Sequence, residues 1–99
     1  MLAGMLLMIK TFKHKGLERF FTKGSTSGIQ AKHACKIADQ LAFLHAAQTI
    51  GDIDKPGYKL HELRERLKGR WAISVSGNWR IVFIFKDGDA YIVNYEDYH

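Results

Sequence analysis

At 99 residues the chain is long enough for one domain with a single hydrophobic core and too short for two. Hydrophobic residues make up 46% of it, and one cysteine, Cys35, excludes an internal disulfide and is typical of a reducing compartment. The net charge of +5, from 15 Lys and Arg against 10 Asp and Glu, fits either an ordinary soluble surface or a polyanionic partner such as nucleic acid.

The opening stretch MLAGMLLMI carries no charge. It is too short to span a bilayer, which needs about 20 apolar residues, and it lacks the basic region of a secretory signal. Met1, Met5 and Met8 are all possible starts. We therefore predict that residues 1–7 are an N-terminal extension and that residues 8–99 form a single domain, the alternative being an edge strand that begins earlier. No membrane association is expected, and we predict a cytoplasmic protein.

The first half of the chain predicts one strand and two helices. Residues 8–14 alternate like a strand, and residues 16–23 place three large apolar side chains on one side of a short helix. The segment 24–28 breaks that helix. Residues 30–47 follow a helical period, which Gly51 ends, before a turn at Pro56-Gly57. The predicted apolar stripe of this second helix is Ala34, Ile37, Ala38, Leu41, Leu44 and Ala47. The predicted polar side is Lys32, Lys36, Asp39 and Gln40.

The second half predicts an antiparallel meander. Residues 71–76 alternate apolar and small polar side chains, and residues 79–85 are apolar on both faces, as in a central strand. Asp87-Gly88 fits a type I′ hairpin turn, which leads into a third strand over 90–95. Together the elements predict an α+β fold, with two N-terminal helices packed on an antiparallel β-sheet and the other face available for function.

Arg80 stands out as a charged residue inside the predicted central strand. Its planar guanidinium suits a phosphate, which it can grip through two hydrogen bonds. A salt bridge to Asp89, Glu96 or Asp97 at the sheet surface is the slightly favoured alternative.

The sequence gives little support for a metal site, a nucleotide-binding loop or a catalytic cysteine. No histidine pair has the i, i+4 spacing of a helical metal site, and no CxxC or HExxH occurs. Glu96, Asp97 and His99 could in principle hold a metal, but on a strand only the last two share a face. No glycine-rich phosphate loop follows a strand. Cys35 falls within an alanine-rich helix, where a packed thiol is favoured over a nucleophile. We expect no metal and no cofactor.

The remaining chemically capable residues fall into two groups. His61 is followed by the basic residues Arg64, Arg66, Lys68 and Arg70, and the chain ends with Asp97, Tyr98 and His99. Singly, these are ordinary surface residues. Together they contain the parts for cutting an RNA phosphodiester without metal, which needs a base, an acid and cations for the phosphoryl oxygens. Histidine suits both proton roles, and an aromatic ring can stack on an unpaired base.

Four stretches carry a resemblance to a known family: MIKTFKHKGLERFF, YKLHEL, GRWAISVSGNWRIVF and GDAYIVNYEDYH. From Met8 to His99 the chain resembles the HigB toxins of the RelE/ParE superfamily of toxin–antitoxin systems. The most specific matches are the terminal DYH and the WxIxVxxNWRIxF hairpin.

The resemblance implies a ribosome-dependent endoribonuclease that cuts mRNA in the decoding site. It also implies a microbial-ribonuclease-like fold and a helix-turn-helix antitoxin, similar to HigA, as the partner. The catalytic positions implied are His61, Asp97, Tyr98 and His99, with Arg64 and Arg80 as the cations. Glu62 stands where the family often has proline, which removes a backbone restraint after His61.

Two alternatives remain open. The ParE branch of the superfamily uses the same fold to poison gyrase without cutting RNA, and an inactive module that only binds RNA or an antitoxin is also compatible. The histidine pair and the terminal tyrosine favour the nuclease, because a pure binder has no chemical need for them. The resemblance does not specify the codon preference, or which histidine is the acid and which the base.

Overall fold

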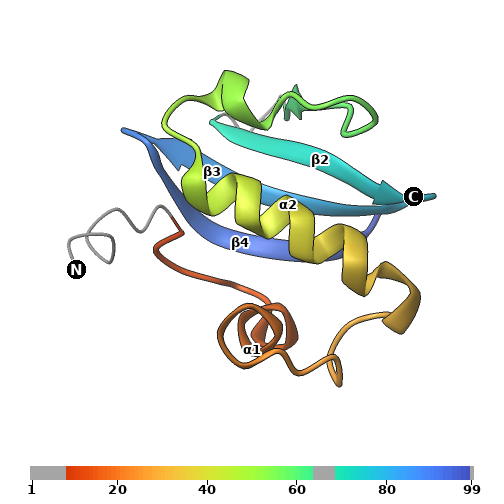
Figure 1. Ribbon diagram of the computed structural model, residues 1–99. Coiled ribbons are helices and arrows are strands. Elements are labelled where there is room, and N and C mark those ends of the chain that lie inside the picture. Colours follow the sequence, from red (N-terminus) through yellow and green to blue (C-terminus); the bar gives the residue numbers. More distant parts are fainter. Residues whose placement is uncertain (1–8, 64–68, 99) are drawn as a thin grey trace.

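Residues 9–63 and 69–98 are described in a computed structural model of the protein, and they form two α-helices and a four-stranded antiparallel sheet (Figure 1). The predicted α+β class is therefore confirmed. The predicted extension, residues 1–7, lies outside the described residues and stays a prediction.

The helices begin and end on local signals. Helix α1 spans Lys15–Lys23; the ring Nδ1 of His14 accepts a hydrogen bond from Leu17 N at 2.9 Å, and Gly24 ends the helix in a left-handed conformation. Helix α2 spans Ala34–Ala46 and is preceded by a 3₁₀ turn, η2, at Ala31–His33. A second 3₁₀ turn, η3, at Ile50–Ile53 leads toward the sheet. The helical period predicted over 30–47 thus divides between η2 and α2.

The sheet has the strand order β1-β2-β3-β4, with β1 at His61–Glu62, β2 at Arg70–Ser76, β3 at Trp79–Lys86 and β4 at Asp89–Asp97. Strand β3 pairs with both β2 and β4, as its two apolar faces predict. At the second hairpin, Asp87 and Gly88 have φ angles of 53° and 82°, which confirms a turn with two left-handed positions. The two-residue strand β1 has no counterpart in the sequence prediction.

The strand predicted over 8–14 is wrong for the residues that the structure describes. Residues 9–14 make two isolated parallel bridges to β4, Ile9 to Ala90 and Phe12 to Val93, instead of a continuous ladder. The physical reason lies in β4, where Ile92 has a φ of 53° and its N–H binds the side-chain oxygen of Thr11. This kink interrupts the edge that a regular strand would follow.

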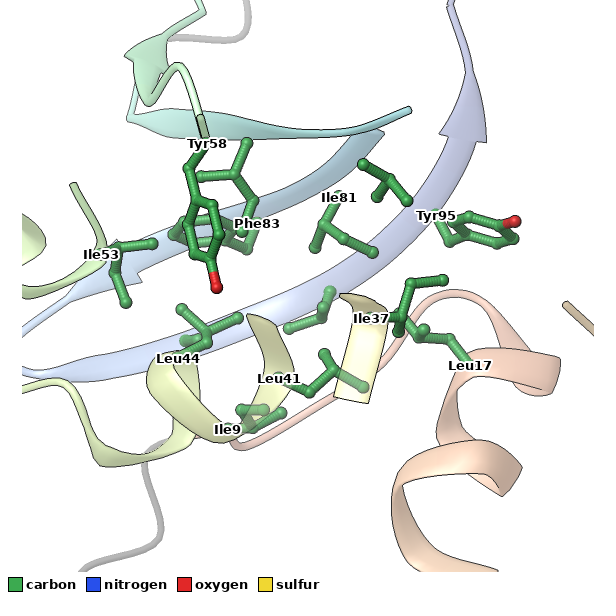
Figure 2. Close-up of a cluster of buried hydrophobic side chains, with 14 of the residues drawn as sticks. Ile9, Leu17, Ile37, Leu41, Leu44, Ile53, Tyr58, Ile81, Phe83 and Tyr95 are labelled. Atoms are coloured by element: carbon green, nitrogen blue, oxygen red, sulfur yellow. The ribbon is translucent and has the colours of Figure 1, made fainter. Parts of the chain in front are cut away.

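One face of the sheet is covered by α2, which runs roughly along the strands in Figure 1. Figure 2 shows Ile37, Leu41 and Leu44 of this helix facing Ile81 and Phe83 of β3. Since side chains alternate along a strand, Arg80 of β3 points to the face opposite α2.

Three predictions about α2 are wrong. Ala38, placed on the predicted apolar stripe, is exposed, because it lies about 100° around the helix from the buried Ile37. Gln40, predicted on the polar side, is fully buried, and its amide donates a hydrogen bond of 2.7 Å to the main-chain oxygen of Ser74. Cys35, predicted to be packed, is exposed. It precedes the buried Ile37 by two residues, which is about 200° around a helix and therefore on the far side.

The approach of α1 to the following loop gives a first testable expectation. A Cβ added to Gly16 would lie 2.7 Å from the main-chain Cα and oxygen of Gly28, so the backbone would have to move. We expect Gly16→Ala to lower the free energy of unfolding by about 1–3 kcal/mol, measured by urea denaturation. The matched control is Gly51→Ala, whose nearest atom, Thr49 Oγ1, is at 3.8 Å; it should change stability by less than about 1 kcal/mol. Equal effects of the two substitutions would show that the contact with Gly28 is not tight.

Candidate functional site

A hollow of about 210 Å³ opens beside the β2–β3 turn. Three residues singled out from the sequence line it: His61 of β1, Arg80 of β3 and Tyr98, which follows β4. The other lining residues are Lys59, Ile73, Ser74, Gly77, Asn78 and Trp79. The meander is what assembles them, because it brings positions 61, 80 and 98 to one end of the sheet.

Arg80 is held by a neighbour on β4. Its Nε donates to Glu96 Oε2 at 2.7 Å and its Nη2 lies 2.6 Å from the same oxygen, because Arg80 and Glu96 are cross-strand partners. Only 15% of the Arg80 side chain is exposed. The slightly favoured salt bridge is therefore present, and Glu96 is the partner among the three carboxylates considered. Asn94 donates to the other carboxylate oxygen, Glu96 Oε1, at 3.3 Å.

Tyr98 lies over the guanidinium of Arg80. The Cζ atom of Arg80 is 3.9 Å from the centroid of the Tyr98 ring, a cation–π contact. The main-chain N–H of Tyr98 donates to Asn78 O at 2.7 Å, which ties the end of the chain to the β2–β3 turn. The ring itself is 58% exposed. An exposed aromatic ring above a cation can stack on an unpaired base while the cation meets its phosphate.

His61 is exposed and lies on the strand at the edge of the sheet, opposite Ala72 of β2. Its ring Nδ1 is 2.9 Å from the main-chain oxygen of Lys59. Among the described residues the ring thus has a hydrogen-bond partner at Nδ1, and the side chain is exposed, as a group that exchanges protons with a bound substrate needs to be.

The other predicted site residues are placed differently. Asp97 ends β4 opposite Trp79, and by alternation its side chain points to the face opposite that of Glu96 and Tyr98; it is not among the described residues that line the hollow. Arg70 begins β2, shares the face opposite α2 with Arg80 and is likewise not among them. The remaining predicted residues, Arg64, Arg66, Lys68 and His99, lie outside the described residues.

Sequence reasoning missed Lys59 and Asn78, both of which line the hollow. Lys59 could have been found from the sequence, because it is a basic residue that precedes His61 by only two positions. Asn78 had none beyond its place in a turn, because its contribution is the main-chain oxygen that receives Tyr98 N.

A buried polar pair supports the hollow from the α2 side. His33 is 3% exposed, and its Nδ1 lies 2.7 Å from the hydroxyl oxygen of Tyr95. The Tyr95 ring stacks on Trp79, with centroids 4.5 Å apart and planes at 27°, and Trp79 lines the hollow. This pair therefore fixes β4 just before Glu96 and Tyr98.

Burial of this pair makes the stability of the fold depend on pH. Burial, followed by the charge of Lys32, lowers the pKa of His33 below its ordinary value, and burial also lowers the pKa of His14. Because the unfolded chain then binds protons at a higher pH than the folded one, the contribution of these histidines is present above pH ~6.5 and is lost as the pH falls below it. We expect the urea midpoint to be lower at pH 5 than at pH 7.5.

The variant His33→Gln, which keeps a partner for the Tyr95 hydroxyl, should reduce this pH dependence without abolishing it, since His14 remains. Urea denaturation at both pH values measures it. An undiminished pH dependence in the variant would show that His33 does not contribute.

Within the described ranges 9–63 and 69–98, no cluster of three or more His, Cys, Asp or Glu side chains could hold a metal ion. Nor does that part of the chain contain a helix both long and apolar enough to cross a membrane. The described lining of the hollow offers the imidazole of His61, the cations of Lys59 and Arg80, and the aromatic rings of Trp79 and Tyr98.

Comparison with known proteins agrees with this set of groups. The family described as "RelE-like toxin of type II toxin-antitoxin system HigB" matches residues 10–99. A protein named "Endoribonuclease HigB", from Proteus vulgaris, is 52% identical over 92 residues, which cover 93% of this chain and all of that protein.

Proposed function

Since this chain belongs to the RelE-like HigB toxin family of type II toxin–antitoxin systems, we propose that it is an endoribonuclease that cuts mRNA in the decoding site of the ribosome and so inhibits translation. The observation that carries the proposal is the shared hollow of His61, Arg80 and Tyr98. The hollow combines a group for proton transfer, a cation for phosphate and an aromatic ring for stacking. RNA cleavage needs all three, whereas a surface that only binds RNA does not need a proton-transfer group.

The proposed reaction is attack of the 2′-hydroxyl on the adjacent phosphorus, without a metal ion. The 2′-oxygen bonds to phosphorus and loses its proton to a base, while the 5′-oxygen leaves and takes a proton from an acid. The products are a 2′,3′-cyclic phosphate and a 5′-hydroxyl. His61 and His99 are the proposed proton-transfer groups, since an imidazole titrates near neutral pH.

The proposed role of Arg80 is to stabilise the charge that builds on the phosphoryl oxygens. In the free protein Glu96 neutralises it. A phosphate entering the hollow can approach the guanidinium donors that Glu96 leaves free, since an arginine carries five N–H groups. Arg64 is proposed as a second cation, with Arg66, Lys68 and Arg70 as contacts to RNA. Tyr98 is proposed to complete the catalytic group by stacking on a base. Asp97, whose side chain points to the other face of β4, is proposed to contribute by positioning the end of the chain that carries Tyr98 and His99.

The family implies an antitoxin partner, because a type II toxin is controlled by a bound antitoxin protein. We propose a HigA-like helix-turn-helix protein in this role. We also propose that the toxin acts in the cytoplasm, where its substrate complex of ribosome and mRNA is found, and that residues 8–99 are the functional domain.

Brief induction tests the proposal against its alternatives. Expression alone should stop growth, and co-expression of the antitoxin should restore it. Sequencing of RNA 5′ ends within minutes of induction should reveal new ends inside coding regions. Broken chromosomal DNA with intact mRNA would instead identify a gyrase poison, and unimpeded growth with abundant folded protein would identify an inactive binding module.

A further inference from the structure

Lys59 has a main-chain conformation that lysine rarely adopts. Its φ of 53° lies in the left-handed region, which favours glycine and asparagine and strains other residues. Such a conformation persists only where neighbouring contacts impose it.

The contacts that impose it come from β2. His61 is paired with Ala72, so counting two residues along each antiparallel strand would place Lys59 opposite Ser74. Instead, the carbonyl of Tyr58 accepts the hydrogen bond from Ser74 N, at 2.7 Å. Lys59 is therefore one residue too many for the ladder, and the chain bulges there.

The bulge changes the partner of the Lys59 carbonyl. In a regular ladder that oxygen would accept from Ser74 N; here it lies 2.9 Å from Nδ1 of the His61 ring. A carbonyl oxygen can only accept, so Nδ1 must carry the proton. In the neutral ring the lone pair is then on Nε2 alone.

We propose that Lys59 is a positioning residue for His61: its bulged main-chain carbonyl holds the ring in the Nδ1–H form, so that Nε2 is the atom that takes the proton of the 2′-hydroxyl. The inference rests on the proposed function only for which proton Nε2 takes, that of the 2′-hydroxyl. Which ring nitrogen of His61 carries the proton does not depend on that function. The contact leaves Nε2 as the ring nitrogen that faces the substrate. In the proposal, His61 acts in its neutral form, as the base, and the acid is then a different group.

The Lys59 side chain complicates the test, because it also lines the hollow and carries a charge. Two uncharged variants separate the effects. Asparagine tolerates the left-handed conformation and should keep the bulge, whereas a β-branched valine strongly disfavours it. A difference between Lys59→Asn and Lys59→Val therefore measures the effect of the main-chain carbonyl of residue 59, because both variants lack the ammonium group.

The state of the ring is measured directly by ¹⁵N NMR of histidine-labelled protein, from the couplings of the His61 ring protons to each nitrogen. In the parental protein and in Lys59→Asn, the neutral ring should be the Nδ1–H form. Lys59→Val should show an increased fraction of Nε2–H. A parental ring that is mainly Nε2–H would overturn the proposal, and this measurement stands even if the valine variant does not fold.

Kinetics on mRNA bound to ribosomes give the second readout. Lys59→Val should have a kcat about 10- to 100-fold below that of Lys59→Asn, the usual effect of losing the group that orients a histidine, with little change in KM. Equal kcat values for the two variants would contradict the positioning role. Absence of cleavage by the parental protein would contradict the proposed function instead, and the NMR result alone would then decide the role of Lys59.

Discussion

Replacing His61 with alanine is expected to slow mRNA cleavage by about 100- to 10,000-fold, the usual contribution of a positioned proton-transfer group. The expectation follows from its position: the residue lines the hollow, is exposed, and is held through Nδ1 by the carbonyl of Lys59. Single-turnover cleavage of mRNA on programmed ribosomes measures the effect, because it separates the chemical step from product release.

The same substitution should leave the fold and the ribosome affinity almost unchanged, since an exposed side chain away from the core contributes within about 0.5 kcal/mol to stability. A matched loss of cleavage and of ribosome binding would place His61 at the docking surface. Cleavage by His61→Ala at the parental rate would remove it from the reaction.

Replacing Arg80 with alanine is the second large expected effect, a loss of about 100- to 1,000-fold in the rate of cleavage. Such a loss is typical when a fixed donor to the charge of the transition state is removed. Arg80 is fixed on both sides, by the carboxylate of Glu96 at 2.6 Å and by the ring of Tyr98 above its guanidinium. Its removal also leaves Glu96 as an unpaired negative charge beside the incoming phosphate. Cleavage should therefore fall more than ribosome binding.

Strand β3 offers a matched control. Lys86 lies at the other end of the same strand, on the same face as Arg80, and is exposed. Lys86→Ala removes the same charge and should reduce ribosome affinity modestly, if at all, with no loss in the chemical step. If Arg80→Ala behaves like Lys86→Ala, the contribution of Arg80 is general electrostatic attraction and not catalysis.

The meander could be predicted from the sequence because each of its signals is local. Alternation over 71–76, the Asp87-Gly88 pair and the doubly apolar run 79–85 each require no knowledge of distant residues, and all three appear in the sheet. For the residues that the structure describes, the prediction of a strand over residues 8–14 was wrong for the opposite reason. The pairing of this segment depends on β4, and the kink at Ile92 is not visible in the composition of either segment.

Burial on α2 was harder to predict for a related reason. Gln40 is buried because Ser74, far along the chain, offers a main-chain oxygen, and no periodicity reveals such a partner. The bulge at Lys59 is likewise set by where Tyr58 and His61 meet β2.

The candidate site was predicted in part. The resemblance to HigB toxins named His61, Arg80 and Tyr98, and the hollow brings these three together. The residues offered Glu96 as one of three carboxylates for Arg80 without selecting it, and nothing indicated that the main chain of Lys59 contacts the ring of His61. Both depend on cross-strand register, which a motif does not specify.

The most direct test of metal-independent cleavage on the ribosome is to identify the ends of the RNA that the purified protein produces. End-labelled mRNA is incubated with it, once free and once bound to ribosomes with a defined codon in the decoding site. We predict cleavage only on the ribosome, at that codon, with a 2′,3′-cyclic phosphate on the upstream fragment and a 5′-hydroxyl on the downstream one. Intact mRNA on the ribosome, or fragments that carry a 3′-hydroxyl and a 5′-phosphate, would contradict the account.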